Sequence, residues 1–290
     1  MKITTKFNLV LISVFSIGLI IVALISYNVL QKNARDEVIN HAGMMMEAAL
    51  AIRGYTVKEV RPLLKEQLKE TFLPQSVPSY AATQNFNELR KNKPEYHYKE
   101  ATLNPTNPRD RSADWESDII NEFRDNENRL EVVGERMTPT GKSLYLARPI
   151  RIKNEACLTC HSTVDAAPKT MIKLYGTANG FGWKHNEVVG SQIVSVPLSV
   201  PIAKANKTFL IFIVSCVAIF VVIFLLINVM LQKLIIKPVL KMSSLADEVS
   251  KGNFDAPAFD TSGNDEITDL NASFNRLRIS LDKAMKMLDD

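Results

Sequence analysis

Two cysteines and a histidine in the segment Cys157–His161, CLTCH, have the residue types and the spacing of a c-type haem attachment motif. In such a motif each thiol adds to one vinyl group of the haem, and the histidine that follows projects an imidazole to the iron. The other ring nitrogen of that imidazole should donate to a carbonyl or a carboxylate, which fixes the tautomer. The sequence therefore predicts covalent haem c on Cys157 and Cys160, with His161 as the proximal iron ligand.

Two other kinds of site use cysteines at this spacing, namely a redox dithiol of the thioredoxin type and one half of a zinc site. A dithiol motif follows a strand and opens a helix, whereas the polar run 151–156 precedes this motif. A zinc site needs further ligands, and the one remaining cysteine, Cys216, lies inside an apolar stretch, where we interpret it as a small apolar residue. Haem attachment is therefore the prediction.

The 290-residue chain has a formal net charge of +4 and a hydrophobic fraction of 46%, but this average conceals two strongly apolar blocks. Residues 7–30 and 208–231 carry no formal charge, and each block is long enough to cross a bilayer as a helix. The first block is about twice as long as the apolar core of a signal peptide, and no clear cleavage site follows it. We therefore expect two transmembrane helices in a lipid bilayer.

The flanking charges and the haem motif together predict the orientation. Lysines without nearby acids precede the first block and follow the second, as is typical of cytoplasmic flanks: Lys2, Lys6, Lys233, Lys237 and Lys241. Because haem c is attached on the outer face of the bacterial inner membrane, residues 31–207 should form a periplasmic domain. Residues 1–6 and 232–290 should then be cytoplasmic.

Between the two blocks, the helical pattern continues beyond residue 30 until Pro62 ends or kinks it. Residues 75–83 are expected to form an irregular connection, and two Asn-Pro steps make 104–116 a fixed loop. Arg109 and Arg111 in this loop suit haem propionates, because a guanidinium binds a carboxylate through two parallel hydrogen bonds. The alternative for these arginines is salt bridges to nearby acids: Asp110, Asp114 or Glu116.

Further along, a short helix is expected over 115–123, after which the pattern alternates as it does in strands. Three strands are predicted, at residues 130–133, 143–147 and 190–200. Residues 138–142 form a hairpin turn between the first two, and the Gly- and aromatic-rich segment 175–183 is a loop able to close over a flat cofactor. Strands flanked by helices in one domain predict an α+β fold of the PAS-like kind.

Several segments, taken in order, resemble the family of periplasmic c-haem sensory domains with a PAS-like fold: RGYT (53–56), NPTNPRDRSADWE (104–116), ARPI (147–150), CLTCH (157–161) and GFGWKHNEVVGSQIVSVP (180–197). The resemblance covers nearly all of the periplasmic loop. It implies a membrane-bound bacterial signalling protein with haem on Cys157 and Cys160 and His161 as the proximal ligand. In some members a cysteine on the helix after the first span is the distal ligand, and this chain has none there.

The distal iron position is therefore open. The candidates are the methionines on the first periplasmic helix and the other histidines: Met44, Met45, Met46, His41, His97 and His185. A helical methionine is more often core filler, and a single histidine is more often a surface residue. The iron can also be five-coordinate, with Arg53 or Tyr55 lining the distal face.

Two short heptad segments follow the second apolar block. The first follows Pro238 and carries Val239, Met242, Ala246 and Val249. The second begins at 265–266, and its apolar residues recur at alternating spacings of 3 and 4: Ile267, Leu270, Phe274, Leu277, Leu281, Ala284 and Leu288. The connector 252–263 contains Phe254 and Phe259. This pattern resembles a HAMP module, with Pro238 and Glu266 at its recognised positions. The resemblance implies a parallel homodimer that forms a four-helix coiled coil.

Two functions are consistent with these features. A transmembrane haem sensor would detect redox state or a small, for example gaseous, haem ligand and would signal through the HAMP module. A membrane-anchored electron-transfer cytochrome is the alternative, but it has no use for a bistable cytoplasmic coiled coil. Since no catalytic acid–base set or second cofactor motif is visible, we expect no catalytic residues, no enzyme activity and no nucleic-acid partner. The sequence ends near the end of the second heptad helix, so we expect either a separate cytoplasmic signalling partner or a longer parent chain.

Overall fold

The computed structural model describes residues 1–139, 141–255 and 257–289, with side chains as far as residue 287. The chain divides into two compact units. One is Ser26–Phe209, and the other combines Met1–Ile25 with Leu210–Asp290. The first unit contains the predicted α+β domain, and the second contains most of each apolar block and the two heptad helices.

A four-stranded antiparallel sheet with the order β1-β4-β3-β2 forms the centre of the first unit. Its strands are β1 (His97–Thr102), β2 (Val132–Thr138), β3 (Gly141–Arg151) and β4 (Val188–Pro197). Strand β4 pairs with both β1 and β3, and nearly all of its residues are buried because it is central and covered on both faces. The mixed helix–sheet architecture confirms the predicted α+β fold class.

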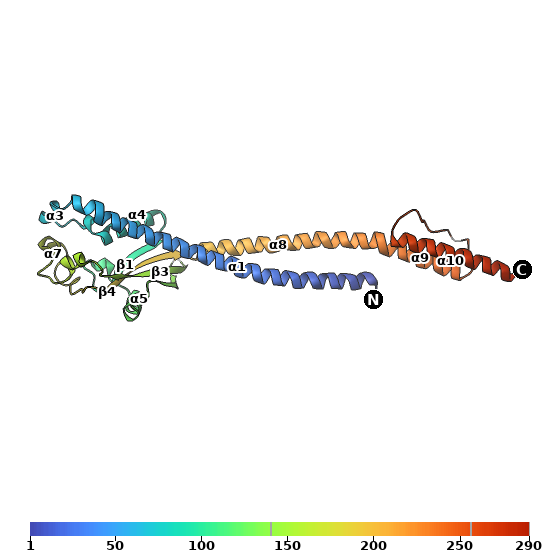
Figure 1. Cartoon of the computed structure of the whole chain (residues 1–290), viewed down its shortest axis with the longest axis horizontal. Coiled ribbons are helices and arrows are strands. Elements are labelled where there is room, and N and C mark those ends of the chain that lie inside the picture. The colour runs from blue at the N-terminus through green and yellow to red at the C-terminus, as the bar shows by residue number, and fades with distance from the viewer. Residues whose placement is uncertain (140, 256, 290) are drawn as a thin grey trace. The chain divides into compact units, whose positions relative to one another are not determined.

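Helices cover both faces of this sheet (Figure 1). The C-terminal part of α1 (Ile3–Tyr55) and helix α4 (Pro78–Asn92) pack on one face, and α5 (Asp114–Asp125) packs on the other. Successive side chains of a strand point to opposite faces, so Val194 of β4 lies in the core beneath α1 while Ile193 lies in the core beneath α5.

Shorter elements complete the domain: η1 (Thr56–Val60), α2 (Arg61–Leu63), α3 (Gln67–Glu70), η2 (Pro74–Ser76), η3 (Pro108–Asp110), η4 (Glu155–Cys157), α6 (Leu158–His161) and α7 (Lys169–Tyr175). The helix that starts with α1 continues through the π-helical turn η1 and ends at Leu63, directly after Pro62, as predicted. Within this region the Thr56 hydroxyl donates to the Ile52 carbonyl at 2.8 Å, a contact that competes with regular helical bonding. π-Helical turns are frequent at functional sites.

The structure corrects one predicted element and adds another. The prediction of an irregular connection over 75–83 is wrong, because α4 begins at Pro78. Proline is favourable in the first helical turn, where its missing N–H is not needed. The added element is strand β1, for which the sequence gives no signal because the charged residues Lys99 and Glu100 lie in the middle of the strand.

The other predicted elements of the domain are confirmed with shifted bounds. The loop from 104 extends to Ala113, the helix predicted at 115–123 is α5, and the three predicted strands are β2, β3 and β4. The predicted turn 138–142 includes Thr140, which lies outside the described residues. On either side of it β2 and β3 pair antiparallel, with Thr138 opposite Gly141.

In the second unit, α1 packs against α8 (Ser199–Met230), with the rings of Phe15 and Phe220 4.1 Å apart. Helix α8 continues through the π-helical turn η5 (Leu231–Ile236) into α9 (Lys237–Ser250). The continuous helices Ile3–Leu63 and Ser199–Ser250 are each long and apolar enough to cross a membrane, by length and composition.

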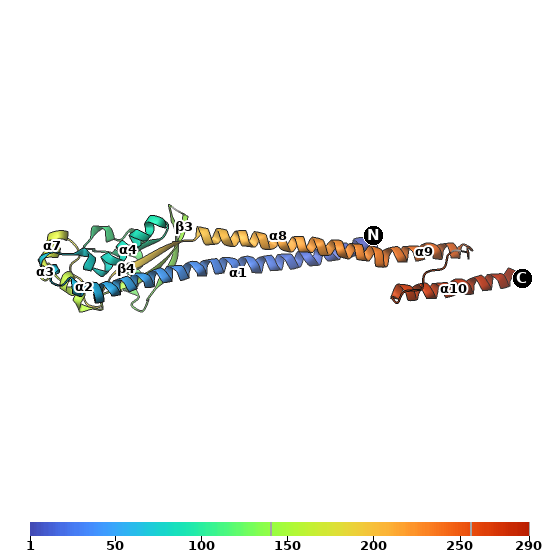
Figure 2. The same cartoon turned by 90° about the horizontal axis from the view of Figure 1, so that it is seen from above.

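Helices α9 and α10 (Glu266–Asp289) run parallel to each other and are joined by an extended connector (Figure 2). The connector is held on α10 by Phe259, whose ring lies edge-on to Phe274 at 5.4 Å and whose backbone exchanges two 3.0 Å hydrogen bonds with the Asn275 amide. Leu270 and Leu277 stay about half exposed, at 48% and 54%. The connector residue Ala256 and the side chain of Leu288 lie outside the described residues.

Candidate haem-attachment site

The CLTCH segment folds as one tight helical turn. The Asn154 side chain accepts a hydrogen bond from the Ala156 backbone at 2.9 Å, and η4 then leads directly into α6. Residues three apart in such a turn lie on the same face, so Cys157 and Cys160 share one face. Both thiols are free, with Cys157 exposed and Cys160 partly buried. Two thiols on one face are what attachment to a single flat porphyrin requires.

The imidazole of His161 is fixed on the side of Nδ1. This atom lies 2.8 Å from the Gly180 carbonyl oxygen and 3.4 Å from the Thr106 hydroxyl. A carbonyl oxygen only accepts, so Nδ1 carries the proton in this contact and Nε2 keeps the lone pair for a metal. Burial lowers the pKa of His161, although the Gly180 contact partly opposes this, and the neutral form is the one that binds metals.

The Trp183 ring covers the face of this imidazole. The two rings are stacked, with centroids 4.0 Å apart and planes inclined by 14°, and the Trp183 backbone N–H donates to the His161 carbonyl at 3.1 Å. The stack and the Nδ1 contact together fix the ring plane. The sequence predicts a loop able to close over a flat cofactor here, but it gives no sign that Trp183 contacts His161.

The two loops that hold His161 are bound to each other. The Asn104 side chain accepts from the Gly180 N–H and donates to the Phe181 carbonyl, both at 3.2 Å. Gly180 has φ +88°, and a Cβ placed on it would lie 2.0 Å from the hydroxyl oxygen of Thr106. Glycine is therefore required at this position, because both its backbone conformation and its contact with Thr106 exclude a side chain.

The two arginines predicted to bind propionates have different surroundings. Arg109 pairs with Asp110 at 3.0 Å, and its guanidinium lies 5.1 Å from the centre of the Tyr80 ring. Arg111 donates to the Asn179 side chain at 3.1 Å, and among the described residues no carboxylate lies within ion-pair distance of it. Burial raises the pKa of Asp110, although Arg109 partly opposes this.

The end of α1 lies beside the motif. Burial lowers the pKa of Arg53, whereas the Glu100 carboxylate and, to a smaller extent, Tyr98 and Cys157 raise it, and together they hold the pKa above its ordinary value. Likewise, burial raises the pKa of the Cys160 thiol, and the neighbouring Arg61 cation opposes this. From the sequence, Arg53 or Tyr55 is expected to line the distal face if the iron is five-coordinate, and nothing in the sequence indicates Arg61.

A buried polar network connects Arg53 to the middle of the sheet. Arg53 forms an ion pair with Glu100, which also accepts from the Tyr98 hydroxyl at 2.7 Å. Gln192 of β4 donates to the same hydroxyl at 3.0 Å. Burial and the Glu100 carboxylate raise the pKa of Tyr98 far above its ordinary value, so it stays protonated and donates. The network ties α1 to both β1 and β4.

The methionines and the histidine on α1 lie well before Arg53. Met46 is fully buried in the core and Met45 packs partly against it, whereas Met44 is 61% exposed. Met44 and His41 lie nine and twelve residues before Arg53, and these separations correspond to about 13 and 18 Å along a helix. Of these residues Met46 in particular serves as core filler.

The other two histidines lie at different ends of the domain. His97 pairs with Ser195, whereas the motif follows Arg151, which pairs with Val188 at the opposite end of β4. Ser195 lies seven residues after Val188, a separation of roughly 23 Å along a strand, so His97 lies far from the motif. His185 is exposed in the turn before β4, two residues beyond Trp183.

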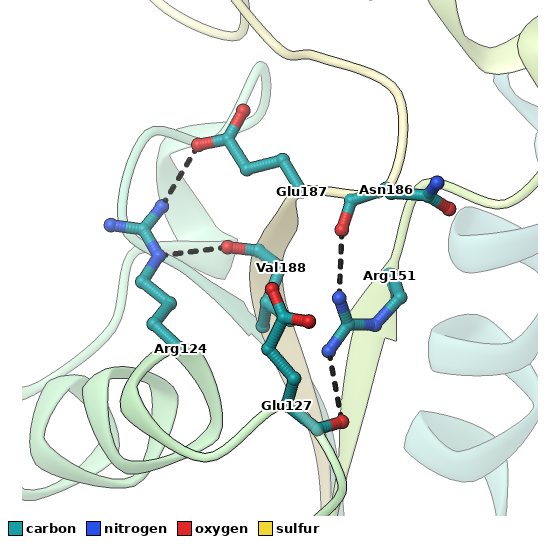
Figure 3. A pocket seen from close by; sticks show the side chains of 6 residues that line it. All are labelled: Arg124, Glu127, Arg151, Asn186, Glu187 and Val188. Atoms are coloured by element: carbon teal, nitrogen blue, oxygen red, sulfur yellow. Dashed lines mark hydrogen bonds and ion pairs between the residues drawn. The ribbon is translucent and has the colours of Figure 1, made fainter.

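A surface pocket of about 340 Å³ between α5 and the end of the sheet has a supporting role (Figure 3). Arg151 donates to the Asn186 carbonyl at 2.9 Å and to the Glu127 carbonyl at 3.2 Å. Arg124 donates to the Val188 carbonyl at 2.8 Å. These contacts hold the segment that follows Trp183, but the pocket does not include the thiols.

The donor set at the motif fits a c-type haem better than the alternatives. It offers two free thiols on one face and an imidazole with its metal-binding nitrogen available. Among the described residues, no group of three or more His, Cys, Asp or Glu side chains is arranged to hold a bare metal ion, so the zinc alternative finds no further ligands there.

Comparisons with known proteins identify two regions. Residues 31–197 match the family model described as Tll0287-like, and residues 230–283 match the HAMP domain. One solved structure, described as the crystal structure of the cyanobacterial heme-protein Tll0287, is 15% identical with a TM-score of 0.44. The match covers 56% of this chain and 95% of that one. No curated protein matches the chain.

Proposed function

Because this chain belongs to the Tll0287-like family and also carries a HAMP domain, we propose that it is a haem sensor of the bacterial inner membrane. In this proposal residues 31–207 form a periplasmic domain with covalent haem c, and residues 7–30 and 208–231 cross the membrane. The HAMP region within residues 232–290 is cytoplasmic and passes the signal to a separate cytoplasmic protein. Bound haem would supply an iron centre that changes oxidation state or takes up a small ligand.

One observation carries the haem assignment: the Nδ1 atom of His161 is bound to the Gly180 carbonyl beside two free thiols that share a face. This contact leaves Nε2 available to iron in the orientation that the Trp183 stack maintains. Cys157 and Cys160 would form the thioether bonds and His161 the proximal iron bond. Such an outer contact of a ligating histidine is also what increases its basicity toward a metal.

The surrounding cations support the haem assignment further. We assign the propionates to Arg109 and Arg111, of which Arg111 is the better placed because its guanidinium donates to a neutral amide and has no carboxylate partner in the part of the chain that the structure describes. Arg53, whose pKa is influenced by Cys157, would line the other side of the site. A fixed cation near the iron stabilises its less positive, reduced form.

Two covalent connections lead from the site to the membrane. Helix α1 runs without a break to Tyr55, and β4 passes through Leu198 into α8. Within the first unit the two helices meet at Tyr27 and Phe209, whose rings are 5.5 Å apart, and at a 2.6 Å hydrogen bond from Gln31 to Asn206. The Arg53–Glu100 pair joins the motif side of α1 to the sheet. A change at the site can therefore reach the HAMP domain as a shift of α1 relative to α8.

The HAMP match favours sensing over electron transfer. An electron carrier needs an anchor and an exposed haem edge, whereas a HAMP domain relays conformational signals between two-state helical packings. A bias of only about 1–3 kcal/mol between such packings changes output several-fold. Redox state and a diatomic gas are both consistent with the site as stimuli.

The direct test is covalent haem on the full-length protein. The wild type, Cys157→Ala and Cys160→Ala should be expressed in a bacterium able to mature c-type cytochromes, with Cys216→Ala as the matched cysteine control. We expect haem peroxidase staining of the wild-type and Cys216→Ala bands on a denaturing gel, and weak or lost staining of the two motif variants. A wild-type band without haem would refute the assignment. Spectra of the oxidised, reduced and CO-treated protein then separate redox sensing from ligand sensing.

A further inference from the structure

Helix α1 carries an apolar stripe on the face that points away from the sheet. The stripe consists of Met44, Ala48, Ala51 and Tyr55, all of them exposed, with Met44 at 61% and Tyr55 at 63%. Their spacing of 4-3-4 places them within an arc of about 60° on a helix with 3.6 residues per turn. The residues of α1 that pack on the sheet lie on the other side of the helix: Ala42, Met46 and Ala49.

The pattern of the stripe is that of a seam between parallel helices. Apolar residues at alternating spacings of 3 and 4 form the contact positions of a coiled coil, and two alanines in the middle let helices approach closely. Polar residues occupy the same face of α1 before the stripe begins: Asn33, Glu37 and Asn40. Met44 lies 14 residues, about 21 Å along the helix, beyond the apolar block that ends at residue 30, so lipid chains do not account for the exposed stripe.

We infer that the α1 stripe is the surface through which the sensor domain binds a second copy of this chain. The inference rests on the proposed function, because the HAMP domain supplies the second copy. A HAMP domain pairs two chains in parallel, and α1 is one continuous helix from Ile3 to Tyr55. A symmetric pair of chains brings the same patch of each copy together, and the α1 stripe is self-complementary in this sense.

This contact would lie next to the candidate haem site. Tyr55 ends the stripe two residues after Arg53, which pairs with Glu100 and whose pKa Cys157 influences. A change in the position of Arg53 would therefore alter the packing of Tyr55 against the second copy. The contact between the two α1 stripes would therefore couple movements of the two sensor domains in a dimer.

Cysteine cross-linking of the full chain in membranes tests the inference. In a Cys216→Ser background, Ala48→Cys and Ala51→Cys report on the stripe, and Leu277→Cys reports on the HAMP domain. Ala113→Cys is the matched control, since it is also an exposed alanine but lies at the start of α5, on the opposite face of the sheet. After mild oxidation we expect the two stripe variants to move from the monomer band to the dimer band, while Ala113→Cys stays monomeric.

The possible outcomes separate this inference from the proposed function. Cross-linking of Leu277→Cys without cross-linking of either stripe variant would overturn the α1 contact and leave the HAMP dimer intact. Cross-linked stripe variants without a Leu277→Cys dimer would support the stripe and refute the HAMP dimer. A product at a mass other than that of the dimer would identify a different partner and would also overturn the inference.

Discussion

Replacement of Gly180 by alanine tests how the site holds His161. Gly180 supplies the carbonyl that binds Nδ1, and its own position is set by Thr106 and Asn104. An alanine Cβ would lie 2.0 Å from the Thr106 hydroxyl oxygen and 2.8 Å from the Thr106 Cα. The hydroxyl can rotate away, but the Cα belongs to the backbone, so the loop that carries the carbonyl must move. The imidazole then loses its fixed orientation.

The expected cost has two parts. An alanine with φ near +88° is strained by about 1–2 kcal/mol, and forcing extra atoms against a packed backbone adds about 1–3 kcal/mol. Gly182 separates the backbone strain from the steric clash, because its φ is +82° but a Cβ placed there meets no atom within 4 Å. Gly182→Ala should therefore show the strain alone. At roughly 2–4 °C per kcal/mol for a domain of this size, Gly180→Ala should melt several degrees below Gly182→Ala.

The assay is thermal unfolding of the detergent-solubilised holoprotein, followed by the haem absorbance, together with oxidised and reduced spectra at room temperature. We expect Gly180→Ala to change the axial-ligand bands and Gly182→Ala to keep the wild-type spectrum. If the two variants melt at the same temperature and both keep the wild-type spectrum, the Gly180 carbonyl does not position the proximal ligand, and the description of the site is wrong.

Two further predictions concern the connections from the site. Glu100→Gln leaves Arg53 without its carboxylate partner, and we expect the variant to lose about 2 kcal/mol of folding free energy in a denaturant titration. This loss is below the 3–5 kcal/mol typical of a broken buried pair, because the Arg53 side chain is 26% exposed and glutamine still accepts a hydrogen bond. The control is Glu88→Gln in the exposed pair Lys91–Glu88, which should have almost no effect in the same titration. Leu277→Glu places a charge in the exposed seam of α10 and should weaken cross-linking between HAMP domains without changing the haem spectrum, whereas unchanged cross-linking would argue against pairing through this seam.

The sequence carries a signal for the candidate site where that signal is local, and it carries none where the contacts depend on residues far away in the chain. The CLTCH motif, the Asn-Pro loop and the heptad helices are each readable within a short segment. The sequence gives no signal for strand β1 because Glu100 is buried and Lys99 is partly buried through pairing with Arg53 and Glu116, which lie 47 and 17 residues away in the chain. A strand with charged inner positions looks like a surface segment until its counterions are known.

The same limit applies to the residues around His161. A loop over the cofactor was predicted from the glycines and aromatics near Trp183, but the Gly180 contact depends on how two loops meet. Arg109 and Arg111 were equivalent in the sequence, and only the structure separates the one paired with Asp110 from the one without a carboxylate partner among the described residues.

In the proposed sensor the state of the haem moves α1 relative to α8, and a distance between the two helices measures this movement directly. Spin labels on Asn33→Cys and Lys207→Cys, in a Cys216→Ser background, lie at exposed positions of α1 and α8 close to the Gln31–Asn206 contact. Distances should be measured on the full chain in bilayers in the oxidised, reduced and CO-bound forms. We predict that the label-to-label distance differs between at least two of these forms. An identical distance distribution in all three would contradict the sensor account and favour an electron carrier.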